Sequence, residues 1–505
     1  MISRRAALKG ALLGGGILTA AQALRYMPNT ANAGTSFDYP LAIPPLLSGK
    51  KRDGMRIFNL RMQKGSVEFF KGVKTPTFGV NGNFLGPSLR MRAGETVRLN
   101  VHNTIGEPAT LHWHGLHVPA LFDGGPHQVI EPGKIWSPEF SIKQMAGTFW
   151  YHPHTLHNTG QQVWKGIAGL MLVEDEDSDR LDMPKDYGID DIPLVLQDRL
   201  FNRDGSFRYI EAMHNVMMGM KGDVPLTNGT ITPYFKATTN RLRLRLLNGS
   251  NARLFNLGFD DDRSFYQIAT DGSFLEAPYQ TNRVRLGPGE RAEIIVELSR
   301  NEPVVLRTYP FTGSGGIMGM MRRGMGMMRN MMGDDNRRFD FLQIRPSASL
   351  SSSPEMPARL INLPRLDAST AVKTRRFVME MLMGPAMMMG GGNPFSINGR
   401  AMEMNRIDEI IKLGDTEIWE IHNASPLPHP FHIHDIQFQI LDRNGEPPHP
   451  GERGFKDTVT VDPDETVRVI AKFEDYADPD NPYMYHCHIL EHEDNGMMGQ
   501  FVVKA

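Results

Sequence analysis

The sequence contains a single cysteine among 505 residues, so no disulfide can form within the chain. It also lacks a charge excess, because 55 Lys and Arg against 57 Asp and Glu give a formal net charge of −2. Such a balance does not attract a polyanion, which argues against a nucleic-acid-binding protein. After residue 33 no apolar run approaches the ~20 residues that a membrane span needs. A hydrophobic content of 40% excludes general disorder, so we expect a folded protein without a membrane span.

The first 33 residues are typical of an export signal. The pair Arg4-Arg5 precedes an apolar, glycine-rich run from Gly10 to Ala23, and Ala31-Asn32-Ala33 supplies small residues for a cleavage site. This order of features is that of a signal peptide, and the arginine pair resembles the twin-arginine type, whose pathway exports folded proteins. We therefore expect a periplasmic protein. A short amphipathic helix of the mature fold is the alternative interpretation.

Most of the remaining chain alternates apolar and polar residues with a period of two, which predicts β-strands. Three such strands end at an asparagine, and a turn with proline at its start precedes another strand in each copy: Asn103 with Pro132-Gly133, Asn248 with Pro288-Gly289, and Asn423 with Pro463-Asp464. A pattern that recurs at this spacing indicates three similar domains. We expect an all-β protein of three Greek-key β-sandwich domains, near residues 37–176, 177–350 and 355–505.

Ten of the 17 histidines fall into four clusters, which occur in the first and third domains only. His112-Trp113-His114 and His432-Ile433-His434 each begin nine residues after the repeated asparagine of their own copy, where the middle copy has Leu257-Gly258-Phe259. Tyr151-His152-Pro153-His154 likewise corresponds to Tyr485-His486-Cys487-His488. Histidines at i and i+2 lie on one face of a strand and can converge on metal ions. The first and third domains are therefore expected to meet and share a metal site, with the middle domain as a spacer.

The one cysteine, Cys487, lies between His486 and His488, so its sulfur must point to the opposite face of the strand. Together with His429, His492 and a weak axial Met497 it supplies the donor set of a blue-copper electron-transfer centre. The other eight clustered histidines are expected to hold a copper cluster. Zinc is the alternative metal, but this soft donor set suits copper better. The remaining seven histidines are assigned no metal: His102, His117, His127, His157, His214, His422 and His449.

These motifs resemble those of three-domain multicopper oxidases, whose domains are cupredoxin-like, and the resemblance covers essentially the whole chain. It implies four copper ions. Type 1 copper is expected at His429, Cys487, His492 and Met497, type 2 at His112 and His432, and the type 3 pair at His114, His152, His154, His434, His486 and His488. The resemblance also implies that a reductant gives electrons to type 1 copper and that dioxygen is reduced to water at the cluster.

Two acidic residues match the positions from which members of this family supply protons to that reaction. They are Asp123, in Leu121-Phe122-Asp123-Gly124-Gly125, and Glu493, next to His492. Without the resemblance, Asp123 has the features of a turn residue and Glu493 those of a solvated surface residue.

Methionine is unusually frequent, and 18 of the 32 methionines fall in three short stretches. A thioether is a soft ligand that selects Cu(I), although methionine also fills hydrophobic cores. We interpret residues 318–332 as copper-binding because glycine and arginine are interspersed there. For Met379–Met389 copper binding and core packing remain equally good interpretations, and for Met213–Met220 core packing is the better one. The candidate substrate-copper ligands are Met318, Met320, Met321, Met325, Met327, Met328, Met331, Met332, Asp334 and Asp335.

Methionine-rich segments of this kind resemble those of periplasmic copper efflux oxidases, which oxidise Cu(I) to Cu(II), a group close to the bacterial laccases. That group usually has an acidic residue and a methionine four and two positions before the type 1 histidine, where this chain has Ser425 and Leu427. The leading hypothesis is an exported, monomeric oxidase of cuprous ion that uses dioxygen in copper tolerance, with phenols as incidental substrates. The alternatives are a laccase-type oxidase of phenols, diamines, Fe(II) or Mn(II), and a protein that sequesters Cu(I).

Deleting residues 318–332 tests the interpretation of the first methionine-rich stretch. Thioethers concentrate Cu(I), so the deletion is expected to raise the copper concentration needed for half-maximal oxidation. A bulky phenol needs no thioether, and its oxidation is expected to stay equal or become faster. Oxygen uptake with each substrate measures the two activities separately. If both fall in parallel, the stretch serves the fold and not the substrate.

Overall fold

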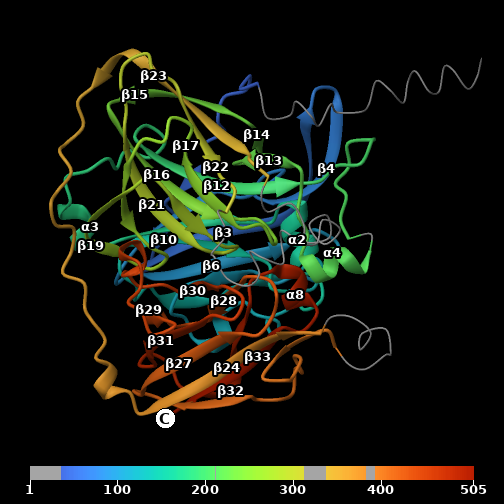
Figure 1. Ribbon diagram of the computed structural model, residues 1–505. Helices are drawn as coiled ribbons and strands as arrows, with labels where there is room; N and C mark the ends of the chain where they lie inside the picture. The colour runs from blue at the N-terminus through green and yellow to red at the C-terminus, as the bar shows by residue number, and fades with distance from the viewer. Residues whose placement is uncertain (1–35, 211, 312–336, 383–392) are drawn as a thin grey trace, which may run out of the picture.

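The computed structural model describes residues 36–210, 212–311, 337–382 and 393–505. Strands dominate, and they form six sheets that follow one another in pairs along the chain. The green and yellow strands of the second domain lie at the top of Figure 1, and the orange and red strands of the third lie at the bottom. Each pair of sheets encloses a hydrophobic core to which both sheets contribute. The expectation of an all-β protein of cupredoxin-like Greek-key sandwiches is confirmed.

The first pair of sheets contains the histidine strands of the first domain. Its strands are β1 (Leu46–Leu47), β2 (Lys50–Arg52), β3 (Met55–Phe70), β4 (Val73–Val80), β5 (Ser88–Arg92), β6 (Thr96–Asn103), β7 (His112–His114), β8 (Ile135–Trp136), β9 (Glu139–Ser141), β10 (Gly147–His152) and β11 (Gly169–Glu174). One sheet has the order β1-β5-β11-β10-β7 and the other β2-β3-β6-β8, with β4 paired to β3 and β9 to β6. The short helices here are η2 (Ala120–Phe122), α2 (Thr159–Lys165) and α3 (Glu176–Arg180).

The second pair of sheets carries none of the clustered histidines. Its strands are β12 (Asp191–Arg199), β13 (Val224–Thr227), β14 (Thr230–Ile231), β15 (Tyr234–Thr239), β16 (Arg241–Asn248), β17 (Phe255–Phe259), β18 (Phe265–Ala269), β19 (Phe274–Thr281), β20 (Val284–Leu286), β21 (Arg291–Glu297), β22 (Val304–Thr308) and β23 (Asp340–Ser351). The sheet orders are β14-β13-β12-β16-β21-β18-β19 and β15-β23-β22-β17-β20. Helix α4 (Met213–Met218) lies between β12 and β13 in sequence.

The third pair of sheets holds Cys487 and the remaining clustered histidines. Its strands are β24 (Lys373–Met381), β25 (Phe395–Ile397), β26 (Glu409–Lys412), β27 (Thr416–Asn423), β28 (His429–Ile433), β29 (Phe438–Arg443), β30 (Thr458–Val461), β31 (Thr466–Lys472), β32 (Asp478–Cys487) and β33 (Met498–Lys504). The sheet orders are β25-β24-β27-β31-β29 and β26-β33-β32-β28-β30. The helices are η3 (Ala368–Thr370), η4 (Pro450–Glu452) and α8 (Leu490–Asp494). Among the helices of the described ranges, none is long and apolar enough to cross a membrane.

The repeated asparagine has the same structural role in all three domains. Each ends its strand (β6, β16 or β27), donates from Nδ2 to two backbone carbonyls, and accepts at Oδ1 from the amide two residues later. Its backbone carbonyl accepts from the second residue of the proline-containing turn, namely Gly133, Gly289 or Asp464. All three turn residues have positive φ, 78°, 83° and 59° respectively. The repeated asparagine and the repeated proline-containing turn are therefore hydrogen-bonded to each other in all three domains.

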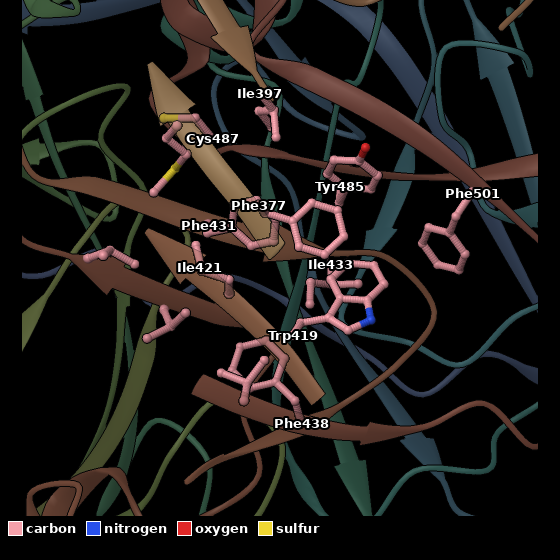
Figure 2. Close-up of a cluster of buried hydrophobic side chains, with 14 of the residues drawn as sticks. Phe377, Ile397, Trp419, Ile421, Phe431, Ile433, Phe438, Tyr485, Cys487 and Phe501 are labelled. Atoms are coloured by element: carbon pink, nitrogen blue, oxygen red, sulfur yellow. The ribbon is translucent and has the colours of Figure 1, made fainter. Parts of the chain in front are cut away.

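Aromatic side chains dominate the core of the third domain, which supports the strands around Cys487 (Figure 2). Trp419 packs against Phe377 with ring centroids 4.3 Å apart, and Phe377 in turn contacts the ring of Tyr485 at 4.8 Å. Burying a large apolar side chain stabilises a fold by about 1.5–3 kcal/mol, so this cluster holds β27, β24 and β32 firmly together. Cys487 lies at the border of the same cluster, as Figure 2 shows.

Candidate metal centre

The ten clustered histidines are buried, and strand pairing sets two pairs of them opposite one another. In the first domain β7 pairs antiparallel with β10, which places His112 opposite His152. In the third domain β28 pairs antiparallel with β32, which places His432 opposite His486. Relative exposure of the ten side chains is 1% or less. Neighbouring strands lie about 4.8 Å apart, so each domain presents a compact set of ring nitrogens.

The first and third domains meet at these histidines, as the sequence predicted. His114 stacks on His432 with centroids 3.7 Å apart, and His112 stacks on His434 at 4.0 Å. Among the described residues, ligand-type atoms converge in five groups. Four consist of histidines or histidines with the cysteine: His154, His434 and His486; His114, His152 and His488; His112, His114 and His432; and His429, Cys487 and His492. The fifth joins Asp123 to His112 and His434. The sequence assigned six histidines jointly to a pair of ions, and the structure divides them into the first two triplets.

In the triplet His154, His434 and His486, unprotonated nitrogens face one another. His434 donates from Nδ1 to Asp123 Oδ2 at 2.7 Å, and His486 donates from Nδ1 to the carbonyl of Cys487 at 3.1 Å. A neutral imidazole has one N–H, so the Nε2 atoms of both rings are bare. Burial lowers the pKa of His434 to about 4, so the ring is neutral at pH 7. These two Nε2 atoms are nevertheless only 3.2 Å apart, and His154 Nε2 lies 3.1 Å from His486 Nε2.

The triplet His114, His152 and His488 has the same arrangement. His114 donates from Nε2 to Asp457 Oδ1 at 2.9 Å, which leaves Nδ1 bare. His152 donates from Nδ1 to the carbonyl of Pro153 at 2.7 Å, which leaves Nε2 bare. The two bare atoms are 3.3 Å apart, and neither nitrogen of His488 has a hydrogen-bond partner. Lone pairs at such distances repel unless a cation lies between them, so the residues fit a metal ion in each triplet.

His112 and His432 form a third nitrogen group with His114. His112 donates from Nδ1 to the carbonyl of Asp123 at 2.9 Å, and His432 donates from Nδ1 to the carbonyl of Asp457 at 2.8 Å. The Nε2 atoms of both rings are buried and have no partner. Imidazoles oriented by a backbone carbonyl at the second nitrogen are the usual form of a metal ligand. The site therefore fits a further ion, bound by His112 and His432.

The group around Cys487 has three donor atoms in a triangle. His429 Nδ1 lies 3.1 Å from Cys487 Sγ, His492 Nδ1 lies 3.8 Å from the same sulfur, and the two nitrogens are 3.4 Å apart. Burial raises the pKa of the Cys487 thiol, so a cation is needed to hold it as a thiolate. Two imidazoles and one thiolate in a triangle fit the trigonal donor set of blue copper. The backbone of Met497 is hydrogen-bonded to two residues of this group: its amide donates to the carbonyl of His492, and its carbonyl accepts from the amide of Cys487.

Helix α4 reaches the same group from the middle domain. His492 donates from Nε2 to the carbonyl of Met217 at 3.1 Å, and the ring of Phe395 stacks on His492 with centroids 4.3 Å apart. Met217 is 8% exposed and packs against the core of the third domain, whereas Met213 is 55% exposed. The sequence favoured core packing for Met213–Met220. The structure shows in addition that the carbonyl of Met217 accepts a hydrogen bond from a predicted copper ligand, His492.

Asp123 contacts the histidines of both domains. In addition to the two hydrogen bonds above, its Oδ1 lies 3.3 Å from His112 Nδ1. Burial alone would raise the pKa of Asp123, but the imidazoles of His434 and His112 hold it well below its usual range. Gly124 must lack a side chain here, because a Cβ atom would lie 2.0 Å from the carbonyl of Leu111. Asp123 thus lies next to the nitrogen groups and is more than a turn residue.

Glu493 lies between two histidines of the first triplet. Its Oε1 is 3.3 Å from His154 Nδ1 and its Oε2 is 3.3 Å from His486 Nδ1. Burial, together with the neighbouring Asp494, raises the pKa of Glu493 well above its usual value. The side chain is 1% exposed, so the interpretation of Glu493 as a solvated surface residue is wrong. A buried carboxyl group with a raised pKa binds a proton more readily than an exposed one, which suits it to proton transfer.

The candidate ligands for substrate copper, in the stretch 318–332 and at Asp334 and Asp335, lie outside the described residues. Of the undecided stretch 379–389, Met379 is fully buried in the core of the third domain, and residues 383–389 are not described. Ser425 and Leu427 belong to the turn after Asn423, where Ser425 Oγ donates to the carbonyl of Leu427 at 3.1 Å. None of the seven unassigned histidines belongs to a group of potential metal ligands among the described residues.

Sequence reasoning missed two residues that contact the nitrogen groups. Asp457 accepts from His114 and His432, as described above, and Thr458 Oγ1 lies 3.1 Å from His114 Nε2 and 3.2 Å from His432 Nδ1. Neither residue is part of a histidine motif or of a repeated turn. Asp457 directly precedes β30 and Thr458 begins it, and no sequence pattern singles out either residue.

Replacing Cys487 with Ser tests the copper group in the third domain. The thiolate is the ligand that gives blue copper its intense absorption, so the variant Cys487→Ser should lose the blue band and nearly all turnover. The nitrogen groups do not use the sulfur and should still bind copper, which metal analysis of the purified protein can measure. A blue band of unchanged intensity in this variant would disprove the assignment of Cys487.

Comparisons with known proteins agree with this geometry. Three sequence models described as multicopper oxidase match residues 61–178, 144–319 and 369–505. The chain is 36% identical over 460 residues to the multicopper oxidase mco of Staphylococcus haemolyticus, covering 90% of each chain. It is also 35% identical over 463 residues to the cell division protein FtsP of Photorhabdus laumondii, covering 92% of each.

A solved structure is similar over the same length. The laccase-like multicopper oxidase CueO from the lignin-degrading bacterium Ochrobactrum sp. superposes with a TM-score of 0.81 at 36% identity, covering 92% of this chain and all of that one. The chain is thus similar over nearly its whole length to a multicopper oxidase, a cell division protein and a laccase-like enzyme, and it contains donor sets that fit copper. The chain belongs to the multicopper oxidase family of oxidoreductases.

Proposed function

We propose that the protein couples the one-electron oxidation of Cu(I) to Cu(II) with the four-electron reduction of dioxygen to water, and that it does so in the periplasm as part of copper tolerance. The observation that carries the oxidase part is the combination of three nitrogen groups with one Cys-His₂ triangle. We assign one ion to His429, Cys487, His492 and Met497, one to His112 and His432, and one to each of the two histidine triplets. Four resident copper ions result.

Copper bound at these residues supplies one-electron redox chemistry, with dioxygen as the final acceptor. The residues of the chain connect the places where that chemistry occurs. Cys487 is bonded through the backbone to His486 and His488, which belong to two different triplets. A path of covalent bonds therefore joins the sulfur to both histidine triplets. The hydrogen bond from His486 Nδ1 to the carbonyl of Cys487 adds a second connection between these two residues.

Asp123 and Glu493 handle the protons that water formation consumes. Burial raises the pKa of Glu493, which favours a proton on its carboxyl group beside His154 Nδ1 and His486 Nδ1, so this residue would supply protons next to the first triplet. Asp123 stays ionised and accepts from His434 Nδ1. An ionised carboxylate holds that ring in the tautomer with a bare Nε2 and attracts protons toward the site.

The proposal that the reductant is Cu(I) rests on the surroundings of His492. Its Nε2 is already bonded to the carbonyl of Met217, and Phe395 covers one face of the ring. His492 Nε2 is therefore not free to hydrogen bond to a phenol, whereas a small ion held by thioethers can pass an electron without such a bond. Helix α4 offers an exposed thioether at Met213 and the side chain of His214.

A laccase-type oxidase of phenols or diamines is the second candidate. Ser425 and Leu427 occupy positions at which the copper efflux oxidases usually carry substrate-binding residues, and neither side chain is a good copper ligand. The Ochrobactrum relative is described as having oxidase activity towards lignin model compounds.

The periplasmic location is proposed from the first 33 residues alone, because of their arginine pair and the small residues of the cleavage site.

Steady-state oxygen uptake by the copper-loaded protein tests the choice of substrate. Turnover with Cu(I) should exceed turnover with 2,6-dimethoxyphenol, and Met213→Leu should raise the Cu(I) concentration for half-maximal rate several-fold without changing phenol oxidation. Met183→Leu is the matched control, because Met183 is buried in a separate core cluster. Oxidation of the phenol without measurable Cu(I) turnover would favour the laccase reading and overturn the proposal.

Replacing Asp123 with Asn tests the proton pathway. The amide cannot attract a proton, so reoxidation of the reduced protein by dioxygen should slow by about 10²-fold or more, while reduction of the blue centre keeps its rate. Stopped-flow absorbance times the two half-reactions separately. Asp261→Asn, on the surface of the middle domain, is the control and should leave both rates unchanged. An unchanged reoxidation rate in Asp123→Asn would remove Asp123 from the pathway.

A further inference from the structure

One arginine of the middle domain, Arg291 at the start of β21, is completely buried among residues of all three domains. Its Nε donates to the carbonyl of Thr148 in the first domain at 2.9 Å. Nη1 donates to the carbonyl of Gly289 at 3.0 Å and to Asp457 Oδ1 in the third domain at 2.7 Å. Nη2 donates to the carbonyl of Asp271 at 3.0 Å and to Asp457 Oδ2 at 2.5 Å. All five N–H bonds of the guanidinium group are therefore used.

The bidentate pair of Arg291 and Asp457 fixes the orientation of the carboxylate. Two parallel N–H···O bonds leave the Asp457 carboxylate little freedom to rotate. A lysine ammonium, which acts as a single point charge, could not fix the carboxylate in this way. Asp271 Oδ1 also accepts from the backbone amide of Arg291 at 2.7 Å, and Lys456 contacts Asp271 Oδ2 at 2.8 Å. Gly115 leaves the necessary space, because a Cβ atom there would lie 2.4 Å from Asp457 Oδ2.

Asp457 in turn sets the rings of two histidines from different domains. Its Oδ1 accepts from His114 Nε2, and its backbone carbonyl accepts from His432 Nδ1. Thr458 Oγ1 donates to the same Oδ1 at 2.9 Å and lies within hydrogen-bond distance of both rings. These contacts decide which ring nitrogen stays bare: Nδ1 of His114 and Nε2 of His432. The two rings are assigned to different copper ions and stack on each other.

We propose that Arg291 is a positioning residue for the copper cluster, acting through Asp457 to hold His114 and His432 in the tautomer and orientation that bind copper. The middle domain carries no histidine of the cluster, yet through this contact it determines the cluster geometry. It also locks the first and third domains together at the point where they share the ions. The inference rests on the proposed copper sites but not on the identity of the reductant.

The variant Arg291→Lys tests the proposal, because lysine keeps the charge but cannot form the bidentate pair. Copper affinity of the nitrogen groups should fall by about 10–100-fold, the usual effect of losing an outer partner of a metal ligand. Metal analysis after dialysis against graded chelator and the type 2 signal in electron paramagnetic resonance measure this loss. The blue absorption per protein should stay unchanged, because neither Arg291 nor Asp457 contacts the Cys487 group.

Arg375→Lys is the matched control. Arg375 is also buried and forms a bidentate pair, with Glu417 in the third domain, but it contacts no clustered histidine. This variant should lower thermal stability while keeping full copper content and an unchanged type 2 signal. If it loses type 2 copper to the same extent as Arg291→Lys, the effect is general destabilisation and the proposal is wrong.

A second variant, Asp457→Asn, keeps the side-chain size and guards against poor folding of Arg291→Lys. It should lose copper from the nitrogen groups in the same range. The double variant should be no worse than either single one, because both changes break one chain of contacts. Folded Asp457→Asn protein with wild-type copper affinity and type 2 signal overturns the proposal. Wild-type protein that binds no copper at the nitrogen groups overturns the proposed function as well, whereas equal loading of wild type and Arg291→Lys overturns only this inference.

Discussion

Bare imidazole nitrogens that crowd together where the first and third domains meet are the constraint on which the structure of the centre depends. His434 and His486 of the third domain approach to 3.2 Å, and His114 and His152 of the first to 3.3 Å, although hydrogen bonds at their other nitrogens leave no proton between them. Across the boundary, His154 Nε2 of the first domain lies 3.1 Å from His486 Nε2 of the third. A buried polar atom without a partner costs about 1–3 kcal/mol. A cation at these groups would offset that cost. It would also join the two domains, because each of the three histidine groups draws residues from both.

The surroundings of these nitrogens are built to keep them bare. Four acceptors each receive a hydrogen bond from the N–H of one ring and so fix its tautomer: the carboxylates of Asp123 and Asp457 and the carbonyls of Pro153 and Cys487. The two carboxylates come from different domains, and each contacts a histidine of the opposite domain. Arg291 of the middle domain fixes one of them. The domain without copper ligands therefore contributes to the centre through hydrogen bonds, and through α4 it also covers His492.

Much of this arrangement could be predicted from the sequence, for identifiable reasons. The strand that ends at an asparagine and the turn that follows are local patterns, and Asn103, Asn248 and Asn423 repeat the same bonds. Counting from them aligned the histidine motifs and showed that the middle copy has none. The alternation of side chains along a strand separated Cys487 from its two histidine neighbours. The donor set then followed from ligand chemistry.

Other features depend on contacts between segments far apart in sequence, which no local pattern shows. The division of six histidines into two triplets results from how the two domains meet. Asp457 and Arg291 are 166 positions apart and carry no motif. Glu493 has the local sequence of a surface helix, and only the packing of α8 against the first domain buries it. The domain limits and the copper type at each group stay predictions.

The central claim is that copper ions lie between the facing nitrogens and at the Cys487 triangle. A crystal structure of the copper-loaded protein, with anomalous difference maps calculated from data on both sides of the copper absorption edge, tests it most directly. The account predicts four copper peaks: one within each histidine triplet, one beside His112 and His432, and one at His429, Cys487 and His492. Density at the Cys487 group alone, with the histidines of the two domains still facing one another and no copper between them, would contradict it.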